Sequence, residues 1–316
     1  MGELSKYIGE IGEDIAKNFF EKVGWKSVIQ NETIQCIHPQ KHKDGTRKRT
    51  THGVDILFSY ISQTEPATLQ HVYVSCKNTS NPYPQNPTNT FKTYLKDLII
   101  GLECFKHSKL KYGIAESFNG FSNQIDTGVL FWISCDKETN DNVIDKIKFC
   151  RIDNSFDFGN IYVIDNEIAL FHTKIIDYIE KTFKEHEWSY YLPETGIVYA
   201  DKSITRNTKI LPVEFINSRF ITFRLDNTNS TNNKPILLIA TKDDFTKDNL
   251  GMYIQVAREY TSEITTEYYF LFPNYNKIEN SSEVNNVKMA LPEKLQISFE
   301  VASFNSERIR GLYNGQ

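Results

Sequence analysis

Two apolar, alternating runs near the N-terminus constrain the fold of this chain most. They are VDILFSYI at residues 54–61 and HVYVSCK at residues 71–77, and a polar connection separates them. Alternation of this kind predicts two neighbouring β-strands, and the connection is long enough for a hairpin. Along the second run, Tyr73, Ser75 and Lys77 share one face of the strand. A cation therefore ends a strand that is otherwise suited to burial, and its presence there needs an explanation.

Helical patterns flank the two runs. Apolar residues at three- and four-residue spacing predict a helix over residues 3–23 and another over residues 91–106. Further strands are predicted at 127–135 and 160–165, and a further helix at 166–183. On the first helix Glu13 shares a face with small residues, so it can point toward a sheet. The order of these elements predicts an α/β fold.

The pattern of polar and apolar residues along the chain changes past about Pro193. Residues 223–235 are predicted as a polar loop, ILLIAT as a strand, residues 252–260 as a helix and EYYFLFP as a strand. We expect two domains: residues 1–190, and an accessory α+β domain at residues 191–316 that binds a partner or recognises the target.

Charge and cysteine usage limit the function classes. A net charge of −4 and a pI near 6.0 exclude a protein that coats nucleic acid, so any such contact is local. The five cysteines are scattered and lack C-x-x-C spacing, which predicts reduced thiols in the cytoplasm. The N-terminal residues are acidic, and no apolar run approaches the ~20 residues that span a bilayer. We therefore expect a soluble, cytoplasmic protein without a membrane partner.

Asp55, position 75 and Lys77 are predicted to converge at one end of the sheet. Mg²⁺ prefers carboxylate oxygens, and a lysine beside such a cation can orient water and balance charge on a phosphate. A site of this composition is suited to phosphodiester hydrolysis, because the cation polarises the phosphoryl oxygen and activates water.

The helix with Glu13, the strand opening G-V-D at residues 53–55 and the string VYVSCKN at residues 72–78 resemble the PD-(D/E)xK nuclease superfamily. The string is similar to that of Mrr-like restriction enzymes, and the resemblance covers roughly residues 5–135. It implies a restriction endonuclease-like fold with a mixed central sheet flanked by helices. It also implies Mg²⁺- or Mn²⁺-dependent cleavage of DNA in bacterial restriction or phage defence.

By this resemblance Asp55 is the metal-binding acid, Lys77 the catalytic lysine and Glu13 the helix glutamate that joins the metal site. Ser75 stands where the family usually has a second acid, so one negative charge is lost from the site. The resemblance leaves three outcomes open: Glu13 suffices with Asp55, an acid on the following helix compensates, or activity is lost. On that helix Glu103 is the first candidate and Asp97 the second.

A polar, basic stretch, HPQKHKDGTRKRTTHG at residues 38–53, precedes the strand of Asp55 and is predicted as an exposed loop between strands. Its members Lys43, Arg47, Lys48 and Arg49 are candidate phosphate contacts, and the competing interpretation is an exposed, solvated loop. The same region contains Cys36, His38, His42 and His52, whose spacing fits no closed structural zinc pattern. We therefore predict no zinc site here.

Two other functions stay open. One is a catalytically inactive nuclease fold that binds DNA, with the metal site broken at Ser75. The other is an interaction subunit in which Lys77 and Asp55 form a structural ion pair. Because the chain is slightly acidic, we expect a separately encoded subunit or a homo-oligomer to complete any DNA-binding surface.

Overall fold

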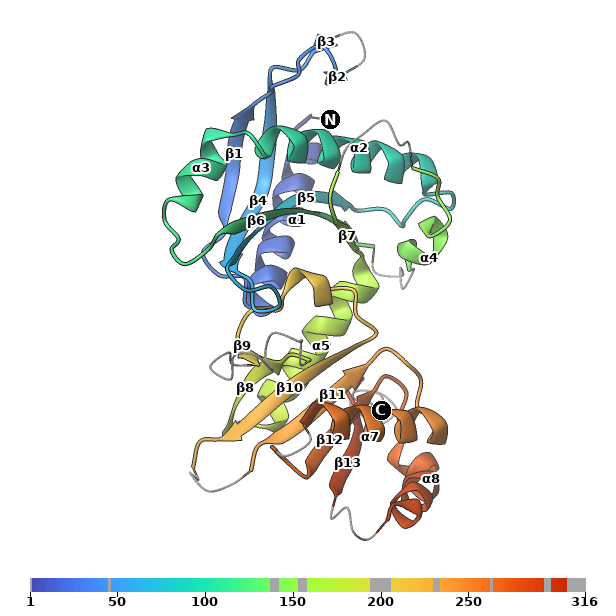
Figure 1. Cartoon of the computed structure of the whole chain (residues 1–316). Coiled ribbons are helices and arrows are strands. Elements are labelled where there is room, and N and C mark those ends of the chain that lie inside the picture. Colours follow the sequence, from blue (N-terminus) through green and yellow to red (C-terminus); the bar gives the residue numbers. More distant parts are fainter. Residues whose placement is uncertain are drawn as a thin grey trace. The chain divides into compact units, whose positions relative to one another are not determined.

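The computed structural model describes residues 2–44, 47–136, 142–152, 158–193, 206–229, 234–261, 264–292 and 297–305. The chain divides into two compact units (Figure 1). The first comprises Met1–Leu170 with Leu211–Asn217, and the second Phe171–Ile210 with Ser218–Gln316. The chain passes from one unit to the next within helix α5 (Asn166–Thr182), earlier than the predicted boundary at residue 190.

The first unit is built on a mixed sheet. Its elements are α1 (Gly2–Lys22), β1 (Ile29–Gln35), β2 (Lys43–Asp44), β3 (Arg47–Lys48), β4 (Thr51–Ile61), β5 (Thr68–Thr79), α2 (Thr88–Phe105), α3 (Lys109–Ala115), β6 (Asn123–Ser134), α4 (Val143–Ile147), β7 (Ile161–Ile164) and the short 3-10 helix η1 (Val213–Phe215). The sheet has the order β1-β4-β5-β6-β7, and β2 and β3 form a separate hairpin. Strands β1, β4 and β5 are antiparallel neighbours, whereas β5, β6 and β7 run parallel. The predicted α/β fold with a mixed central sheet is confirmed.

Helices α1 and α2 cover opposite faces of this sheet, as the side chains of β6 show. Leu130 and Trp132 pack into the apolar cluster formed with α2. Phe131, between them in sequence, has its ring 5.6 Å from that of Phe19 and 5.4 Å from that of Phe20, both on α1. Because successive side chains of a strand point to opposite faces, odd and even positions face different helices. The same alternation decides which helix each residue of β5 faces.

The second unit has its own mixed sheet. Its elements are the greater part of α5, then β8 (His186–Tyr191), β9 (Asn207–Thr208), β10 (Phe220–Asn227), β11 (Ile236–Thr241), α7 (Lys247–Thr261), β12 (Glu267–Phe272), α8 (Lys277–Ala290) and β13 (Ser298–Ser303). The strand order is β13-β12-β11-β10-β8-β9, with β11, β12 and β13 parallel. The predicted strands at ILLIAT and EYYFLFP are β11 and β12, and the predicted helix lies within α7.

One prediction in this unit is wrong. Residues 223–227 are not part of a loop but belong to β10, which pairs with both β8 and β11. Phe223 and Leu225 alternate into the core and are fully buried. The backbone partners on both sides outweigh the low strand propensity of the polar residues, because propensity is weak beside tertiary pairing.

Two findings concern the environment of the chain. All five cysteines are free thiols. Among the described residues, no helix combines the length and the apolar character needed to cross a bilayer.

Candidate functional site

Strands β4 and β5 separate next to Asp55. Their pairing runs from Ile61 and Leu69 to Ile56 and Val74. Beyond that point β4 stays paired with β1, and β5 stays paired with β6. We call the region where the two strands diverge the fork; it comprises residues 51–55 of β4 and 75–79 of β5.

Two side-chain contacts connect the strands at the fork. The Oδ2 atom of Asp55 accepts a hydrogen bond from the backbone N–H of Cys76 at 2.7 Å. The hydroxyl of Tyr73 donates to the backbone carbonyl of Gly53, also at 2.7 Å. A hydrogen bond to an ionised carboxylate is stronger than one between neutral groups, so the main chain of β5 fixes the orientation of Asp55.

Lys77 lies on the face of β5 that is turned toward α2. It is opposite Trp132 in the register with β6, and its Nζ atom lies 5.5 Å from the centre of the Tyr94 ring on α2. An ammonium over an aromatic face is attracted by the ring quadrupole, which favours one position of the lysine side chain. Ser75 shares this face and is buried, with 8% of its surface exposed. Its hydroxyl contributes no charge to the site.

Glu13 approaches β5 from the opposite face. Helix α1 packs closely on β5 at Gly12, where an added Cβ would lie only 2.3 Å from the Cβ of Asn78. Glycine is therefore required for this approach, and it places the next residue, the half-buried Glu13, beside the strand.

The thiol of Cys76 is affected by all three predicted charged residues. Burial raises its pKa well above the ordinary value, the carboxylates of Asp55 and Glu13 raise the pKa further, and the ammonium of Lys77 lowers it. Charges shift a pKa in this way only from nearby. Asp55, Glu13 and Lys77 thus all lie near enough to Cys76 to shift the pKa of its thiol, Glu13 from the side of α1 and Lys77 from the side of α2.

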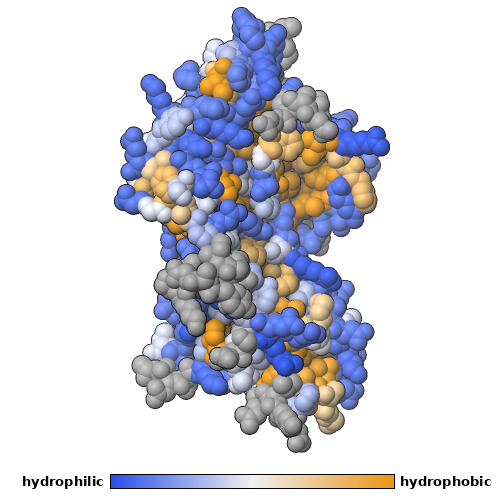
Figure 2. Space-filling model, viewed as in Figure 1, coloured by the Kyte–Doolittle hydropathy of each residue, from blue (hydrophilic) through white to orange (hydrophobic). Residues whose placement is uncertain are grey.

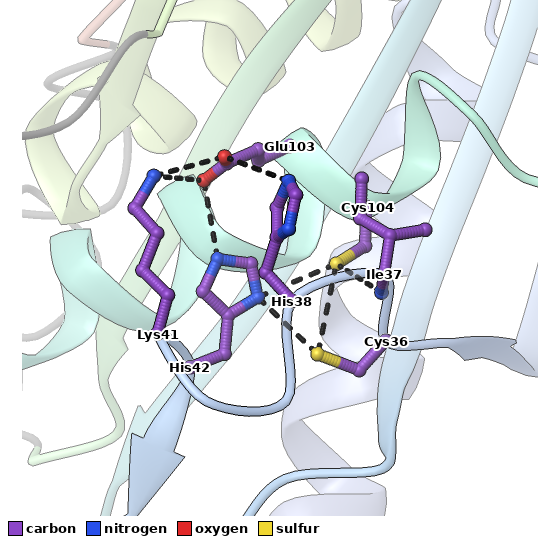
Figure 3. A network of polar contacts seen from close by, with 7 residues as sticks. All are labelled: Cys36, Ile37, His38, Lys41, His42, Glu103 and Cys104. Carbon is purple, nitrogen blue, oxygen red and sulfur yellow. Dashed lines mark hydrogen bonds and ion pairs between the residues drawn. The ribbon is translucent and has the colours of Figure 1, made fainter.

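Glu103 belongs to a different set of contacts (Figure 3). Its carboxylate accepts hydrogen bonds from Lys41 Nζ at 2.9 Å and from His42 Nε2 at 3.1 Å, and His38 Nε2 lies at 3.8 Å. Partial burial works against ionisation, but these two hydrogen bonds hold the pKa of Glu103 below its usual value. The charges that mainly shift the pKa of Cys76 are instead those of Asp55, Glu13 and Lys77.

The second candidate on α2, Asp97, is also engaged elsewhere. Its Oδ1 atom lies 3.3 Å from Nη1 of Arg49. The described contacts of Glu103 and Asp97 thus give no support to a compensating acid on α2, and neither residue is proposed below as a metal ligand.

The basic run forms the β2–β3 hairpin, in which Lys43 is opposite Lys48. Lys43, Arg47 and Lys48 are exposed, and Arg49 is half-buried in its ion pair with Asp97. The hairpin projects from the end of the sheet in Figure 1, and that projection is hydrophilic in Figure 2. Three of the four predicted phosphate contacts are therefore accessible.

The prediction of an exposed loop is wrong for two histidines around this hairpin. His42 is 1% exposed and His52 is 5% exposed, because both pack beneath the hairpin near α2. The backbone N–H of Cys76 was also not predicted as a partner of Asp55, since every residue except proline carries such a group and residue type does not distinguish one from another.

Residues 1–168 match the family described as the GAPS4 protein PD-(D/E)XK nuclease domain. No curated protein and no solved structure matches the chain significantly. The matched region ends close to the boundary of the first compact unit at Leu170, and it contains the fork, Glu13 and the whole five-stranded sheet. The match covers more than half of the chain, and the protein therefore belongs to the GAPS4 PD-(D/E)XK nuclease domain family.

Proposed function

We propose that this protein is a divalent-metal-dependent deoxyribonuclease that hydrolyses phosphodiester bonds in bacterial restriction or phage defence. The observation that carries the proposal is the fork, where the carboxylate of Asp55 is held by the N–H of Cys76. Glu13 and Lys77 act on the same residue from the two faces of β5. Membership of a nuclease family supports a nucleic acid as the substrate.

The acidic side chains at the fork fit a hard cation. Asp55 and Glu13 come from different elements and offer carboxylate oxygens, the donors that Mg²⁺ and Mn²⁺ prefer. These two residues would hold the cation. When bound, such a cation supplies Lewis-acid polarisation of a phosphoryl oxygen and lowers the pKa of water.

The other groups at the fork would orient the reacting groups and balance the negative charge of the phosphate. Lys77 presents an ammonium that balances the charge of a phosphate and orients water beside it. The contact with Tyr94 restricts the lysine side chain. The N–H of Cys76 keeps the Asp55 carboxylate directed at the fork. Lys43, Arg47 and Lys48 of the exposed hairpin would contact the nucleic-acid backbone.

Ser75 favours a second candidate function. The hydroxyl at this position leaves two carboxylates at the fork where the family usually has a further acid. With too little negative charge to hold the cation, the same fold would bind DNA without cutting it. In either candidate function, the residues from 191 onward would recognise the target or bind a partner, such as a separately encoded subunit, in the cytoplasm.

The experiment that separates these functions is cleavage of supercoiled and linear DNA, with RNA in parallel. The purified chain is incubated with Mg²⁺, Mn²⁺ or EDTA, alone and with the product of the neighbouring gene. We expect metal-dependent cleavage of DNA that Asp55→Asn, Lys77→Met and Glu13→Gln abolish. Glu21→Gln, an exposed glutamate on the same helix as Glu13, is the matched control and should cleave normally.

The alternative outcomes are equally clear. DNA that is bound but never cut, in every mixture, would show the non-catalytic binding function. A chain that neither cuts nor binds nucleic acid would show an interaction subunit, and cleavage of RNA alone would overturn the choice of DNA.

A further inference from the structure

Four side chains whose buried donor atoms could bind a metal ion meet beneath the basic hairpin. Cys36, His42, His52 and Cys104 place one donor atom each within 4.8 Å of one another, and we call them the Cys2His2 cluster. Cys36 follows β1, His42 precedes β2, His52 lies in β4 and Cys104 lies on α2. The cluster therefore joins the base of the hairpin to the sheet and to the helix that covers it.

The three distances among His42 and the two cysteines suit one tetrahedral metal ion. His42 Nδ1 lies 3.4 Å from each of the two sulfurs, and the sulfurs are 4.0 Å apart (Figure 3). With Zn–S of about 2.3 Å and Zn–N of about 2.0 Å, a tetrahedral site needs about 3.5 Å between N and S and about 3.8 Å between sulfurs. Each observed separation is therefore within a few tenths of an ångström of the zinc geometry.

The fourth member supplies an independent observation. His52 is 5% exposed, and its Nε2 atom is buried without a hydrogen-bond partner in the described part of the chain. Its ring lies beside that of His42, with the centroids 5.4 Å apart. Buried polar atoms are normally paired, so an orphaned imidazole nitrogen beside two thiols and a second imidazole is suited to bind a metal ion.

The surroundings of the cluster orient its members as outer-shell groups do in zinc sites. His42 Nε2 lies 3.1 Å from Oε2 of Glu103, which leaves the lone pair of Nδ1 directed toward the sulfurs. Lys41 in turn holds Glu103 at 2.9 Å. The backbone N–H of Ile37 donates to the sulfur of Cys104 at 3.4 Å, a contact that favours a thiolate. Glu103 thus has a role in this site rather than at the fork.

We propose that Cys36, His42, His52 and Cys104 bind one structural Zn²⁺ ion. Four protein ligands complete a tetrahedral site and leave no open position, which is typical of structural rather than catalytic zinc. Two thiols and two neutral imidazoles bind the ion as the thiols release two protons to the buffer. Nitrogen and sulfur donors distinguish this site from the oxygen donors at the fork, so the proposal is independent of nuclease activity.

The first test is the metal content of the full-length chain, purified under reducing conditions and measured by plasma mass spectrometry. We expect one zinc per chain, and a clear loss of zinc in Cys104→Ser and in His52→Gln. Cys150→Ser, which changes a half-buried cysteine outside the cluster, and Asp55→Asn at the fork should both keep one zinc. Zinc that persists undiminished in Cys104→Ser and His52→Gln would place the metal elsewhere and overturn the proposal.

A second measurement, on the wild-type chain, tests the proposal even if the variants fail to fold. Zinc is removed from the reduced wild-type chain with a strong chelator, and Co²⁺ is titrated in. We expect ligand-field bands of tetrahedral cobalt with sulfur-to-metal charge transfer, saturating at one equivalent and abolished by Zn²⁺. A reduced wild-type chain that is purified without zinc and gives no such spectrum would refute the site, whatever the variants do.

Discussion

The carboxylate of Asp55 accepts a hydrogen bond from the backbone N–H of Cys76 at 2.7 Å, at the point where β4 and β5 cease to pair. One side chain therefore has two roles. It replaces a backbone hydrogen bond where the two strands no longer pair, and in the proposed function its carboxylate would also help to hold the cation. The two roles respond differently to substitution, and that difference can be measured.

Asp55→Asn and Asp55→Ala should separate stability from cleavage. Asparagine retains an oxygen acceptor for the Cys76 N–H, so the free energy of unfolding should stay close to that of the wild type. Alanine leaves the N–H without this acceptor and should cost about 1–3 kcal/mol. Both variants should lose cleavage. Urea unfolding beside a nicking assay is the measurement, and an alanine variant as stable as the wild type would contradict the structural role.

The reactivity of Cys76 should report on the charges around it. Burial and the carboxylates of Asp55 and Glu13 raise the pKa of this thiol, so little thiolate is present at neutral pH. Removing a carboxylate by Asp55→Asn or Glu13→Gln lowers that pKa and should accelerate alkylation by iodoacetamide. Lys77→Met should slow it.

The rate of alkylation is followed peptide by peptide with mass spectrometry, between about pH 7 and pH 9, across the range of ordinary thiol titration. The exposed Cys135 in the same samples is the internal control. Equal Cys76 rates in the wild type and all three variants would show that these charges do not converge on the sulfur.

Gly12→Ala should damage the fold and the site together. The added Cβ would lie 2.3 Å from the Cβ of Asn78, so α1 must move away from β5 and carry Glu13 with it. Overpacking of this kind costs about 1–3 kcal/mol, and cleavage should fall with it.

Gly113→Ala is the matched control, because Gly113 lies in helix α3 with no atom within 4 Å of the added Cβ. The free energy of unfolding of Gly113→Ala should instead rise by about 0.5–1 kcal/mol, because alanine is the better helix former. Thermal unfolding of both variants is the check, and two equal shifts in Tm would argue against close packing at Gly12.

Neutralising the exposed hairpin should weaken DNA binding through electrostatics alone. Replacing Lys43, Arg47 and Lys48 by glutamine removes up to three cations that can neutralise phosphates, so the salt dependence of log Kd should flatten by about 0.9 for each phosphate left unneutralised. Arg49→Gln should do less, because that side chain is paired with Asp97. Fluorescence anisotropy over a range of salt concentrations gives the slope.

The control for the hairpin is a variant with the same change of charge. Lys184, Lys247 and Lys277 are exposed lysines of the second unit, and their replacement by glutamine should leave the slope nearly unchanged. A similar decrease of the slope in both triple variants would point to general charge rather than to the hairpin.

Much of the first unit was predictable from local pattern. The alternation around Val74, and the helical spacing on both sides of it, predicted β4, β5, α1 and α2 within a few residues. The strand pattern was strong because one sheet buries both of its faces, so its apolar runs are long and continuous. The pattern did not predict β1, whose residues are mostly polar and exposed or half-buried, nor β2, β3, α3, α4 and η1, which are too short to show a period.

The fork and the Cys2His2 cluster differ in how far each could be predicted from the sequence. Asp55, Glu13 and Lys77 lie in long periodic elements, so their residue types and spacing were enough to predict them as candidate nuclease residues. The spacing from Cys36 to His52 matched no closed zinc pattern, because the fourth member of the cluster, Cys104, comes from a helix far along the chain. Likewise Glu103 was one candidate for a compensating acid because of its place on α2, and its contacts with Lys41 and His42 place it beside the Cys2His2 cluster.

Residue pattern alone was therefore enough to predict the two helices that cover the sheet, four of its five strands and their order along the chain, and to select the charged residues proposed to act at the fork. Which side chains meet depends instead on how those elements pack in three dimensions. The physical reason is that the spacing of apolar residues shows which face of a single helix or strand is buried. A set of metal ligands, in contrast, forms only when elements distant in sequence come into contact. For this chain, the approach of α1 at Gly12 and the position of Cys104 beside His42 are contacts of that kind.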